Sequence, residues 1–133
     1  MSQKLVVGLM SGTSLDGIDA ALVHISQDEH QKVQLKLIHF STLPYSESMR
    51  TRILELCDPS KARLEEISLT NMLLGEYFAE AAKKVVSQAG LEMKDVDLIS
   101  SHGQTIFHQP EGKRVEDYMI TSTLQIGDIA VIA

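Results

Sequence analysis

The hydrophobic and polar positions of the first third of this chain predict strands. Residues 4–10 and 18–25 are largely apolar runs, and residues 33–38 alternate apolar with polar side chains. Such runs predict two buried strands followed by a strand with one solvent-exposed face. Because only short polar segments separate the three runs, we expect three consecutive antiparallel strands.

The middle of the chain changes to helical spacing. Apolar residues recur three and four positions apart over residues 47–56 and again over residues 64–89, which predicts two amphipathic helices. Ser46 is an N-cap candidate for the first helix, and Gly90 supplies the C-terminal stop of the second. Gly75 lies inside the second helix, where glycine is unfavourable, so we expect close packing at that position.

The last third returns to strand patterns. Residues 96–100 and 121–126 predict two short strands, and residues 109–117 predict a polar loop between them. The first of these strands follows a long helix, so we expect it to join the sheet in parallel. Asp128 is interpreted as the N-cap of a further helix, with a place near a bound phosphate or metal as the alternative.

This order of elements indicates an α/β fold of one domain at most, since the chain has 133 residues. The net charge of −6, without a basic cluster, argues against a nucleic-acid partner. No signal-peptide pattern and no apolar run of about 18 residues is present, so we expect a cytoplasmic protein without a membrane partner. The single cysteine, Cys57, excludes a disulfide framework and is expected to be a small core residue.

The most particular segment joins the first two predicted strands and reads GLMSGTSLDGID at residues 8–19. Its hydroxyl side chains are those of Ser11, Thr13 and Ser14. Glycines, hydroxyls and backbone N–H groups in a tight turn can approach a phosphate closely. Asp16 and Asp19 add carboxylates that could coordinate a phosphate-bound Mg²⁺ directly or through water.

Two better-known phosphate-binding patterns do not fit this segment. A Walker-type loop requires G-x-x-x-x-G-K-[ST], but Gly8 and Gly12 are one residue too close and Thr13 stands where the lysine is required. A Rossmann G-x-G-x-x-G pattern is absent. A hairpin turn with polar residues is the simpler alternative, but the segment is longer than such a turn needs.

A second candidate segment follows the predicted strand at residues 96–100. His102 and Gln104 could hydrogen-bond the hydroxyls of a ligand such as a sugar, and Gly103 would let that ligand approach. Ligands of α/β sheets gather beyond the carboxyl ends of strands, but these residues taken alone favour a polar loop without function. A general base at His102 is a less favoured role.

Two other kinds of site are not supported by the spacing of the residues. His102, His108 and Cys57 match no zinc pattern. A hydrolase of the Ser-His-Asp type would need a G-x-S-x-G turn after a strand, and the sequence contains none.

Three segments together resemble the anhydro-N-acetylmuramic acid kinases of the sugar kinase, heat-shock protein and actin superfamily. They are residues 8–19, the SSHGQT stretch at residues 100–105 and the LQIGD stretch at residues 124–128. The resemblance implies a ribonuclease-H-like half of an actin-like ATPase, with a five-stranded mixed sheet and flanking helices. Family members are much longer, so residues 1–133 are expected to be the N-terminal part of the first ATPase-like domain, without its remainder or the second domain.

The resemblance implies an ATP-dependent kinase that uses Mg²⁺. Such enzymes open 1,6-anhydro-N-acetylmuramic acid with water and phosphorylate O6 to give N-acetylmuramic acid 6-phosphate, in peptidoglycan recycling. The residues expected at ATP are Gly12, Thr13, Ser14, Leu15, Asp16, Gly17, Ile18 and Asp19. The residues expected at the sugar are His102, Gly103 and Gln104.

The resemblance implies no catalytic residue within this chain. The family's catalytic base is an aspartate of a D-F-R motif, which is expected downstream of Ala133. The expected partner is a small anhydro-amino-sugar, and a homodimer of the full-length enzyme is compatible with the family. Alternative functions are a non-catalytic ATP-binding module of the actin or chaperone type and a kinase for another anhydro-sugar.

Overall fold

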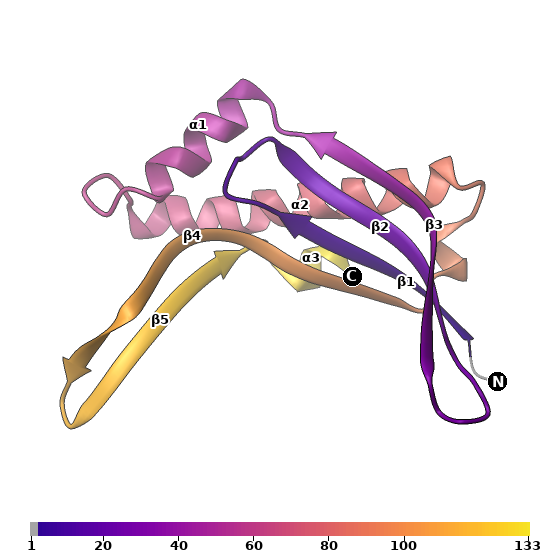
Figure 1. Ribbon diagram of the computed structural model, residues 1–133. Helices are drawn as coiled ribbons and strands as arrows, with labels where there is room; N and C mark the ends of the chain where they lie inside the picture. Colours follow the sequence, from indigo (N-terminus) through magenta and orange to yellow (C-terminus); the bar gives the residue numbers. More distant parts are fainter. Residues whose placement is uncertain (1–2) are drawn as a thin grey trace.

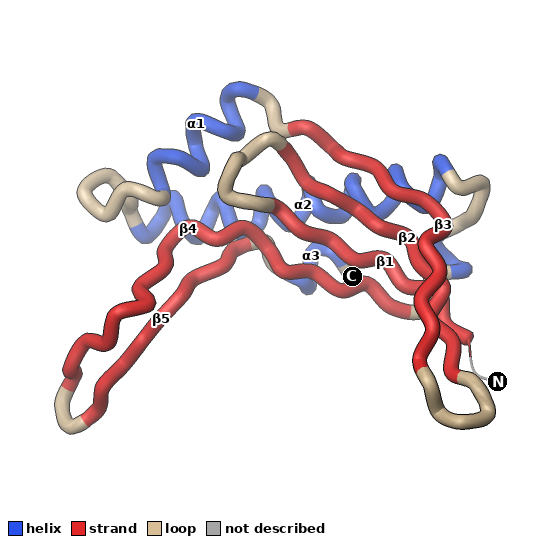
Figure 2. The backbone as a smooth tube through the Cα atoms, in the orientation of Figure 1, coloured by secondary structure: helices blue, strands red, loops and turns tan. Residues whose placement is uncertain are grey.

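Within residues 3–133, five strands and three α-helices follow one another in the order β1–β2–β3–α1–α2–β4–β5–α3 (Figures 1 and 2). The structure is a computed structural model and describes residues 3–133. The strands are β1 (Gln3–Ser11), β2 (Gly17–Gln27), β3 (Val33–Pro44), β4 (Leu98–Val115) and β5 (Tyr118–Ile126). The helices are α1 (Glu47–Leu56), α2 (Leu64–Gln88) and α3 (Ile129–Ile132), and a short 3-10 turn, η1 (Met93–Asp95), precedes β4.

The strands form one mixed sheet in the order β3-β2-β1-β4-β5. β1, β2 and β3 are antiparallel neighbours, as the short connections between them predict. β4 lies parallel to β1, because the chain crosses back through α1 and α2 before it rejoins the sheet. The predicted α/β fold with a five-stranded mixed sheet and flanking helices is confirmed.

The three helices lie on the same face of the sheet (Figure 1). Alternate side chains of β1, those of Leu5, Val7 and Leu9, point to that face and join the core. Leu74 and Phe78 of α2 are fully buried in the same cluster. The other face of the sheet therefore carries the opposite set of side chains, and no helix of the described part of the chain lies over it.

Three predictions about helix ends and packing are confirmed. The Ser46 hydroxyl accepts a hydrogen bond from the Met49 N–H at 3.1 Å and caps α1. The Asp128 carboxylate accepts from the Ala130 N–H at 2.8 Å and caps α3. A Cβ on Gly75 would lie 2.8 Å from the Val131 Cβ, so the glycine permits α3 to pack against α2.

The predicted loop at residues 109–117 is wrong, because β4 continues to Val115 and only a tight turn separates it from β5. The register shifts between Gln109 and Lys113, so Pro110 and Gly112 lie in an irregular part of the ladder. This part of β4 pairs with β5 alone, and a proline there removes no hydrogen bond on its free side. The hairpin formed by β4 and β5 extends away from the helices (Figure 2).

Cys57 is the second correction. It is exposed at the C-cap of α1 and is not a core residue. Cys57 follows the buried Ile53 by four positions, but α1 ends at Leu56, so Cys57 lies at the C-cap beyond the last helical residue, where it is exposed. Within residues 3–133, no helix is both long and apolar enough to cross a membrane.

Candidate functional site

The two candidate segments lie side by side at one edge of the sheet. The loop of residues 12–16 leaves the carboxyl end of β1, and Ser11 at that end pairs with Gln104 of β4. Because β1 and β4 are parallel neighbours, their carboxyl directions coincide, and ligands of such sheets gather at this place. The structure therefore brings the residues expected at ATP close to those expected at the sugar.

The loop is exposed except at one buried position. Gly12, Thr13, Ser14 and Asp16 are exposed, whereas the Leu15 side chain is 4% exposed and belongs to the core. The Leu15 N–H donates to the Gly12 carbonyl at 3.3 Å, which closes a turn. Within residues 3–133, the N–H groups of Thr13, Ser14 and Asp16 have no acceptor, so they are available to an anion.

Leu15 adopts a left-handed backbone with φ of 57°. This conformation costs a non-glycine residue about 1–3 kcal/mol and persists only where the surroundings enforce it. The burial of the side chain supplies that constraint, because a relaxed backbone would withdraw Leu15 from the core. A hydrophobic anchor thus fixes the shape of a loop whose other residues are polar.

The two glycines of the loop region serve different purposes. A Cβ on Gly12 would meet nothing within 4 Å, so open space lies beside this residue. A Cβ on Gly17 would collide with the Leu43 carbonyl oxygen and lie 2.8 Å from the Pro44 Cα. Gly17 is therefore required by the close approach of β3, while Gly12 leaves room for a ligand.

The side chains of Ile18 and Ser11 lie on the helix-covered side. Ile18 is fully buried, so only its backbone could face a ligand. The Ser11 hydroxyl is also buried, which corrects the expectation that it faces a phosphate together with Thr13 and Ser14. The alternation of the strand places Ser11 on the same face as Leu9.

Asp16 and Asp19 are the exposed carboxylates of this region. Asp19 accepts a hydrogen bond from the Thr42 hydroxyl at 2.7 Å, which ties its side chain to β3. In the described part of the chain, no group of three or more His, Cys, Asp or Glu residues is placed to hold a metal ion. Mg²⁺ at a nucleotide usually takes one or two carboxylates, with phosphates and waters, and this pair fits that requirement.

Because β4 contains a bulge, the side chains of His102 and Gln104 lie on opposite faces of the sheet. Leu9 pairs with Ser101 and Ser11 pairs with Gln104, so β4 has one extra residue opposite β1. Gly103 within the bulge has φ of 74°, a conformation that favours glycine. His102 consequently stays exposed on the helix-free face, and Gln104 turns towards the helices.

Gln104 is 1% exposed, and its amide is fully engaged. Its Oε1 accepts from the Ser11 hydroxyl, and its Nε2 donates to the carbonyls of Gly12 and Thr105 at 3.4 and 3.1 Å. Both amide hydrogens are used, so the expected contact of Gln104 with a sugar has no support in this arrangement. Gly103 is likewise buried, and a Cβ there would lie 2.7 Å from the Ile126 carbonyl oxygen.

His102 borders a shallow hollow on the helix-free face. Small residues form its floor, because Gly8 of β1 lies between Ala21 of β2 and Ser100 of β4. Met10 and His102 stand at its end nearest the loop. A ligand seated on this floor would reach the loop and the imidazole together.

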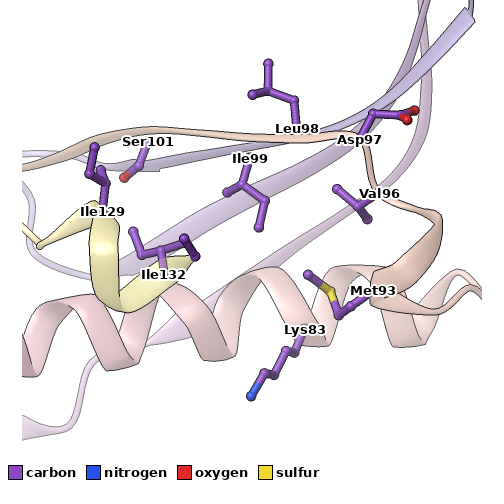
Figure 3. Close-up of a pocket in the computed structure, with 10 residues that line it drawn as sticks. Lys83, Met93, Val96, Asp97, Leu98, Ile99, Ser101, Ile129 and Ile132 are labelled. Atoms are coloured by element: carbon purple, nitrogen blue, oxygen red, sulfur yellow. The ribbon is translucent and has the colours of Figure 1, made fainter.

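A larger hollow lies between β4, α2 and α3, and its lining includes no residue of the loop (Figure 3). Val96 extends into it from the segment after η1, Ile99 from β4 and Ile132 from α3, while Leu98 points to the opposite side of β4 (Figure 3). Apolar side chains dominate its lining, whose polar side chains are those of Lys83, Asp97 and Ser101, and none of the residues expected at ATP or at the sugar takes part in it. We therefore assign the candidate site to the loop and the helix-free face.

Comparison with known proteins gives one consistent result. The sequence model of a family described as anhydro-N-acetylmuramic acid kinase matches residues 4–133. The chain belongs to this family. The match confirms the resemblance indicated by the three segments, and it makes the residues of the loop candidates for a kinase site.

Similar proteins of known name agree with the family match. The chain is 51% identical over 131 residues to the anhydro-N-acetylmuramic acid kinase of Caldanaerobacter subterraneus subsp. tengcongensis, covering 98% of this chain and 33% of that protein. It is 46% identical over 128 residues to the kinase of the same name from Bacillus cereus, covering 96% of this chain and 32% of that protein. The chain thus spans about a third of the length of the curated relatives it matches.

Tyr45 lies beside the candidate site, although no sequence pattern indicated it as a site residue. Its hydroxyl donates to the Ser11 Oγ at 2.9 Å, although 34 positions separate the two residues. Burial raises the pKa of Tyr45 to about 12, and the hydrogen bond with Ser11 opposes this effect only in part. The phenol is therefore a donor throughout the neutral range. No local pattern around Pro44 signals this contact, because it depends on the packing of β3 beside β2.

Proposed function

We propose that this chain is the N-terminal part of an ATP-dependent kinase of 1,6-anhydro-N-acetylmuramic acid. The observation that carries the proposal is the loop of residues 12–16, whose unpaired N–H groups and hydroxyls are exposed at the carboxyl end of β1. The family match gives these groups their interpretation as phosphate ligands. The shared edge of β1 and β4 gives a sugar a place beside them.

The loop would bind the phosphates of ATP through its backbone and its hydroxyls. No described residue accepts a hydrogen bond from the N–H groups of Thr13, Ser14 and Asp16, and the open space beside Gly12 admits a phosphate oxygen. Leu15 and Ile18 belong to the set expected at ATP, but their buried side chains limit them to backbone contacts. Fixed donors aimed at a transferring phosphoryl group stabilise the charge that develops on it.

Asp16 and Asp19 would hold Mg²⁺, directly or through water. When bound, Mg²⁺ neutralises charge on the phosphate oxygens during transfer. The hydrogen bond from Thr42 fixes the Asp19 carboxylate on the helix-free face before any ligand arrives. The carboxylate therefore needs little rearrangement to accept an ion or its water shell.

The anhydro-sugar would lie against the floor of Gly8, Ala21 and Ser100, where His102 can hydrogen-bond one of its hydroxyls. In the proposed reaction water adds to C1 and the bond between C1 and the bridging oxygen breaks. The freed O6 then attacks the terminal phosphorus of ATP, which gives the 6-phosphate and ADP. The group that activates the water is proposed to be an aspartate of a D-F-R motif beyond Ala133.

The remaining parts of the proposal follow from the family. The chain would be completed by the remainder of its domain and by a second domain that closes over ATP and sugar. We propose a cytoplasmic role in peptidoglycan recycling, a small-molecule partner and no nucleic-acid or membrane partner. A homodimer of the full-length enzyme is compatible with this function.

The test uses the purified full-length protein with ATP, Mg²⁺ and 1,6-anhydro-N-acetylmuramic acid. ADP release is followed by a coupled assay, and the sugar product is identified by mass spectrometry. ADP release that requires this sugar, with a product heavier by water plus a phosphoryl group, supports the proposal. ATP binding without sugar-dependent release would instead favour a non-catalytic module, and turnover only with 1,6-anhydroglucose would favour a kinase for another anhydro-sugar.

A further inference from the structure

Three polar residues that are distant in the sequence meet beneath the loop of residues 12–16. Ser11 and Gln104 are 3% and 1% exposed, and Tyr45 contributes its hydroxyl from the segment after β3. The Tyr45 hydroxyl donates to Ser11, and the Ser11 hydroxyl donates to Gln104. Buried polar groups joined in this way define one arrangement, because any other arrangement leaves some of them unpaired.

This network is attached to both ends of the loop. Gln104 Nε2 donates to the Gly12 carbonyl at 3.4 Å, at the start of the loop. The Tyr45 N–H donates to the Asp16 carbonyl at 3.1 Å, at its end. The Ser11 Oγ also lies 3.2 Å from the Gly17 carbonyl oxygen, across the base of the loop.

Because the peptide bond is planar, these contacts also fix the direction in which an N–H group of the loop points. In a planar trans peptide the C=O and the N–H point in opposite directions. The Gly12 carbonyl points inward to Gln104, so the N–H of Thr13 points outward to the exposed side of the loop. A rotated Gly12–Thr13 peptide would instead present a carbonyl oxygen to the phosphate and repel it.

We infer that Gln104 and Tyr45 are positioning residues, which hold the Gly12–Thr13 peptide in the orientation that binds a nucleotide phosphate. This inference rests on the proposed function, because it requires that the loop binds ATP. It gives Gln104 a role in binding ATP in place of the contact with the sugar that the sequence suggests. Gln104 acts on Gly12 directly, whereas Tyr45 acts through the Ser11 hydroxyl.

The chain offers a matched control for each positioning residue. The ring of Tyr77 packs edge-on against Tyr45 at 6.1 Å, and the structure gives its hydroxyl no hydrogen bond to the described residues. Gln125 hydrogen-bonds the hydroxyls of Thr105 and Thr123 through its side chain, and among the described residues it has no hydrogen bond to the loop. Tyr77→Phe and Gln125→Met therefore repeat the same chemical changes without touching the network.

The experiment measures steady-state kinetics of the full-length protein, with the KM for ATP and the KM for the anhydro-sugar determined separately. Gln104→Met is expected to raise the KM for ATP about tenfold, and Tyr45→Phe about threefold, the range expected for loss of one hydrogen bond. The KM for the sugar is expected to change less than twofold. Because Gln104→Met leaves buried polar groups unpaired, at a cost of about 1–3 kcal/mol, its melting temperature is expected to fall roughly 2–12 °C below that of its control, and the kinetics are measured well below that temperature.

Gly12→Val serves as the positive control, because it fills the open space beside the loop. If Gly12→Val raises the KM for ATP but Gln104→Met and Tyr45→Phe do not, the positioning role is overturned and the proposed function stands. If Gly12→Val leaves the KM for ATP unchanged, the loop does not bind ATP and both proposals fail. If Gln104→Met raises only the KM for the sugar, Gln104 contacts the sugar and the positioning role is overturned. If Gln104→Met does not fold, the result for Tyr45→Phe decides the question alone.

Discussion

Gly12 and Gly17 belong to the same polar segment and both are expected at ATP, yet the structure predicts that alanine destabilises the protein at Gly17 and has little effect on stability at Gly12. In Gly17→Ala the new Cβ meets the Leu43 carbonyl oxygen and lies 2.8 Å from the Pro44 Cα. Both contacts are with backbone, and Gly17 pairs with Pro44 in the β2–β3 ladder, so relief requires displacement of β3. In Gly12→Ala the Cβ enters open space.

The magnitudes follow from these contacts. Overpacking that forces backbone shifts costs about 1–3 kcal/mol, so Gly17→Ala should lose roughly 2 kcal/mol of stability. Gly12→Ala should remain within about 0.5 kcal/mol of the parent chain, as exposed substitutions usually do. With a urea dependence of about 2 kcal/mol per molar, the loss at Gly17 lowers the unfolding midpoint by about 1 M.

The assay is urea unfolding of the chain and its two variants, followed by far-UV circular dichroism. A lower midpoint for Gly17→Ala, with an unchanged slope and with Gly12→Ala at the parent value, is the expected result. Equal midpoints for the two variants would refute the reasoning, because β3 would then yield to a Cβ without loss of stability. A change of slope would instead indicate that the unfolded or native state has altered in compactness.

Four further predictions follow. His102→Ala should raise the KM for the anhydro-sugar about three- to tenfold through loss of a hydrogen bond, whereas His108→Ala, farther along β4, should not; kinetics of the full-length protein tests this. Leu15→Ala should cost about 2–4 kcal/mol of unfolding free energy, whereas Leu54→Ala, which is 52% exposed, should cost less than about 0.5 kcal/mol; urea midpoints decide the matter. The pKa of Tyr45 rises from 10.0 to about 12 on folding, so the stability due to its neutral phenol is complete below pH 10 and is lost as the pH rises towards 12. Unfolding experiments over this pH interval should therefore show a smaller loss of stability for Tyr45→Phe than for the parent chain. Residues 1–133 alone should release no sugar-dependent ADP in the coupled assay, and turnover by this chain would place the base among Asp16, Asp19 and His102.

Local patterns predicted most of the fold. The alternation and apolar runs of the first 40 residues give β1, β2 and β3, because hairpin strands are neighbours in both sequence and space. Ser46 and Asp128 mark helix starts, since a cap is a contact between residues two or three positions apart. The parallel position of β4 could also be predicted, because a crossover through a long helix leaves few other solutions.

The length of β4 and the direction of Gln104 could not be predicted in this way. Pro110 and Gly112 ordinarily indicate a loop, but here the irregular pairing with β5 accommodates both within a long hairpin. The alternation of a regular strand would place His102 and Gln104 on the same face. Only the extra residue of β4 opposite β1, with Gly103 in a left-handed conformation, turns Gln104 inward.

The candidate site also has one part that could be predicted from local sequence and one part that could not. The loop of residues 12–16 could be predicted because its glycines, hydroxyls and carboxylates are contiguous in the sequence. The network beneath it could not, since Ser11 contacts residues 34 and 93 positions away. Sequence patterns therefore identify the groups exposed to a ligand, while the residues that orient those groups emerge only from the packing of β1, β3 and β4.

The position of the helices limits which residues can complete the site. Within residues 3–133, the α-helices lie on one face of the sheet, and Asp19 and His102 are exposed on the opposite face (Figure 1). Phosphoryl transfer depends on the exclusion of water and on groups arranged around the transferring phosphorus. Within residues 3–133, nothing covers the helix-free face above Gly8, and the hollow there is open to solvent. For the proposed kinase, the second wall of the site and the base that activates water must therefore approach from the helix-free side, opposite α2. A full-length protein in which the D-F-R aspartate packed on the α2 side would be incompatible with this geometry.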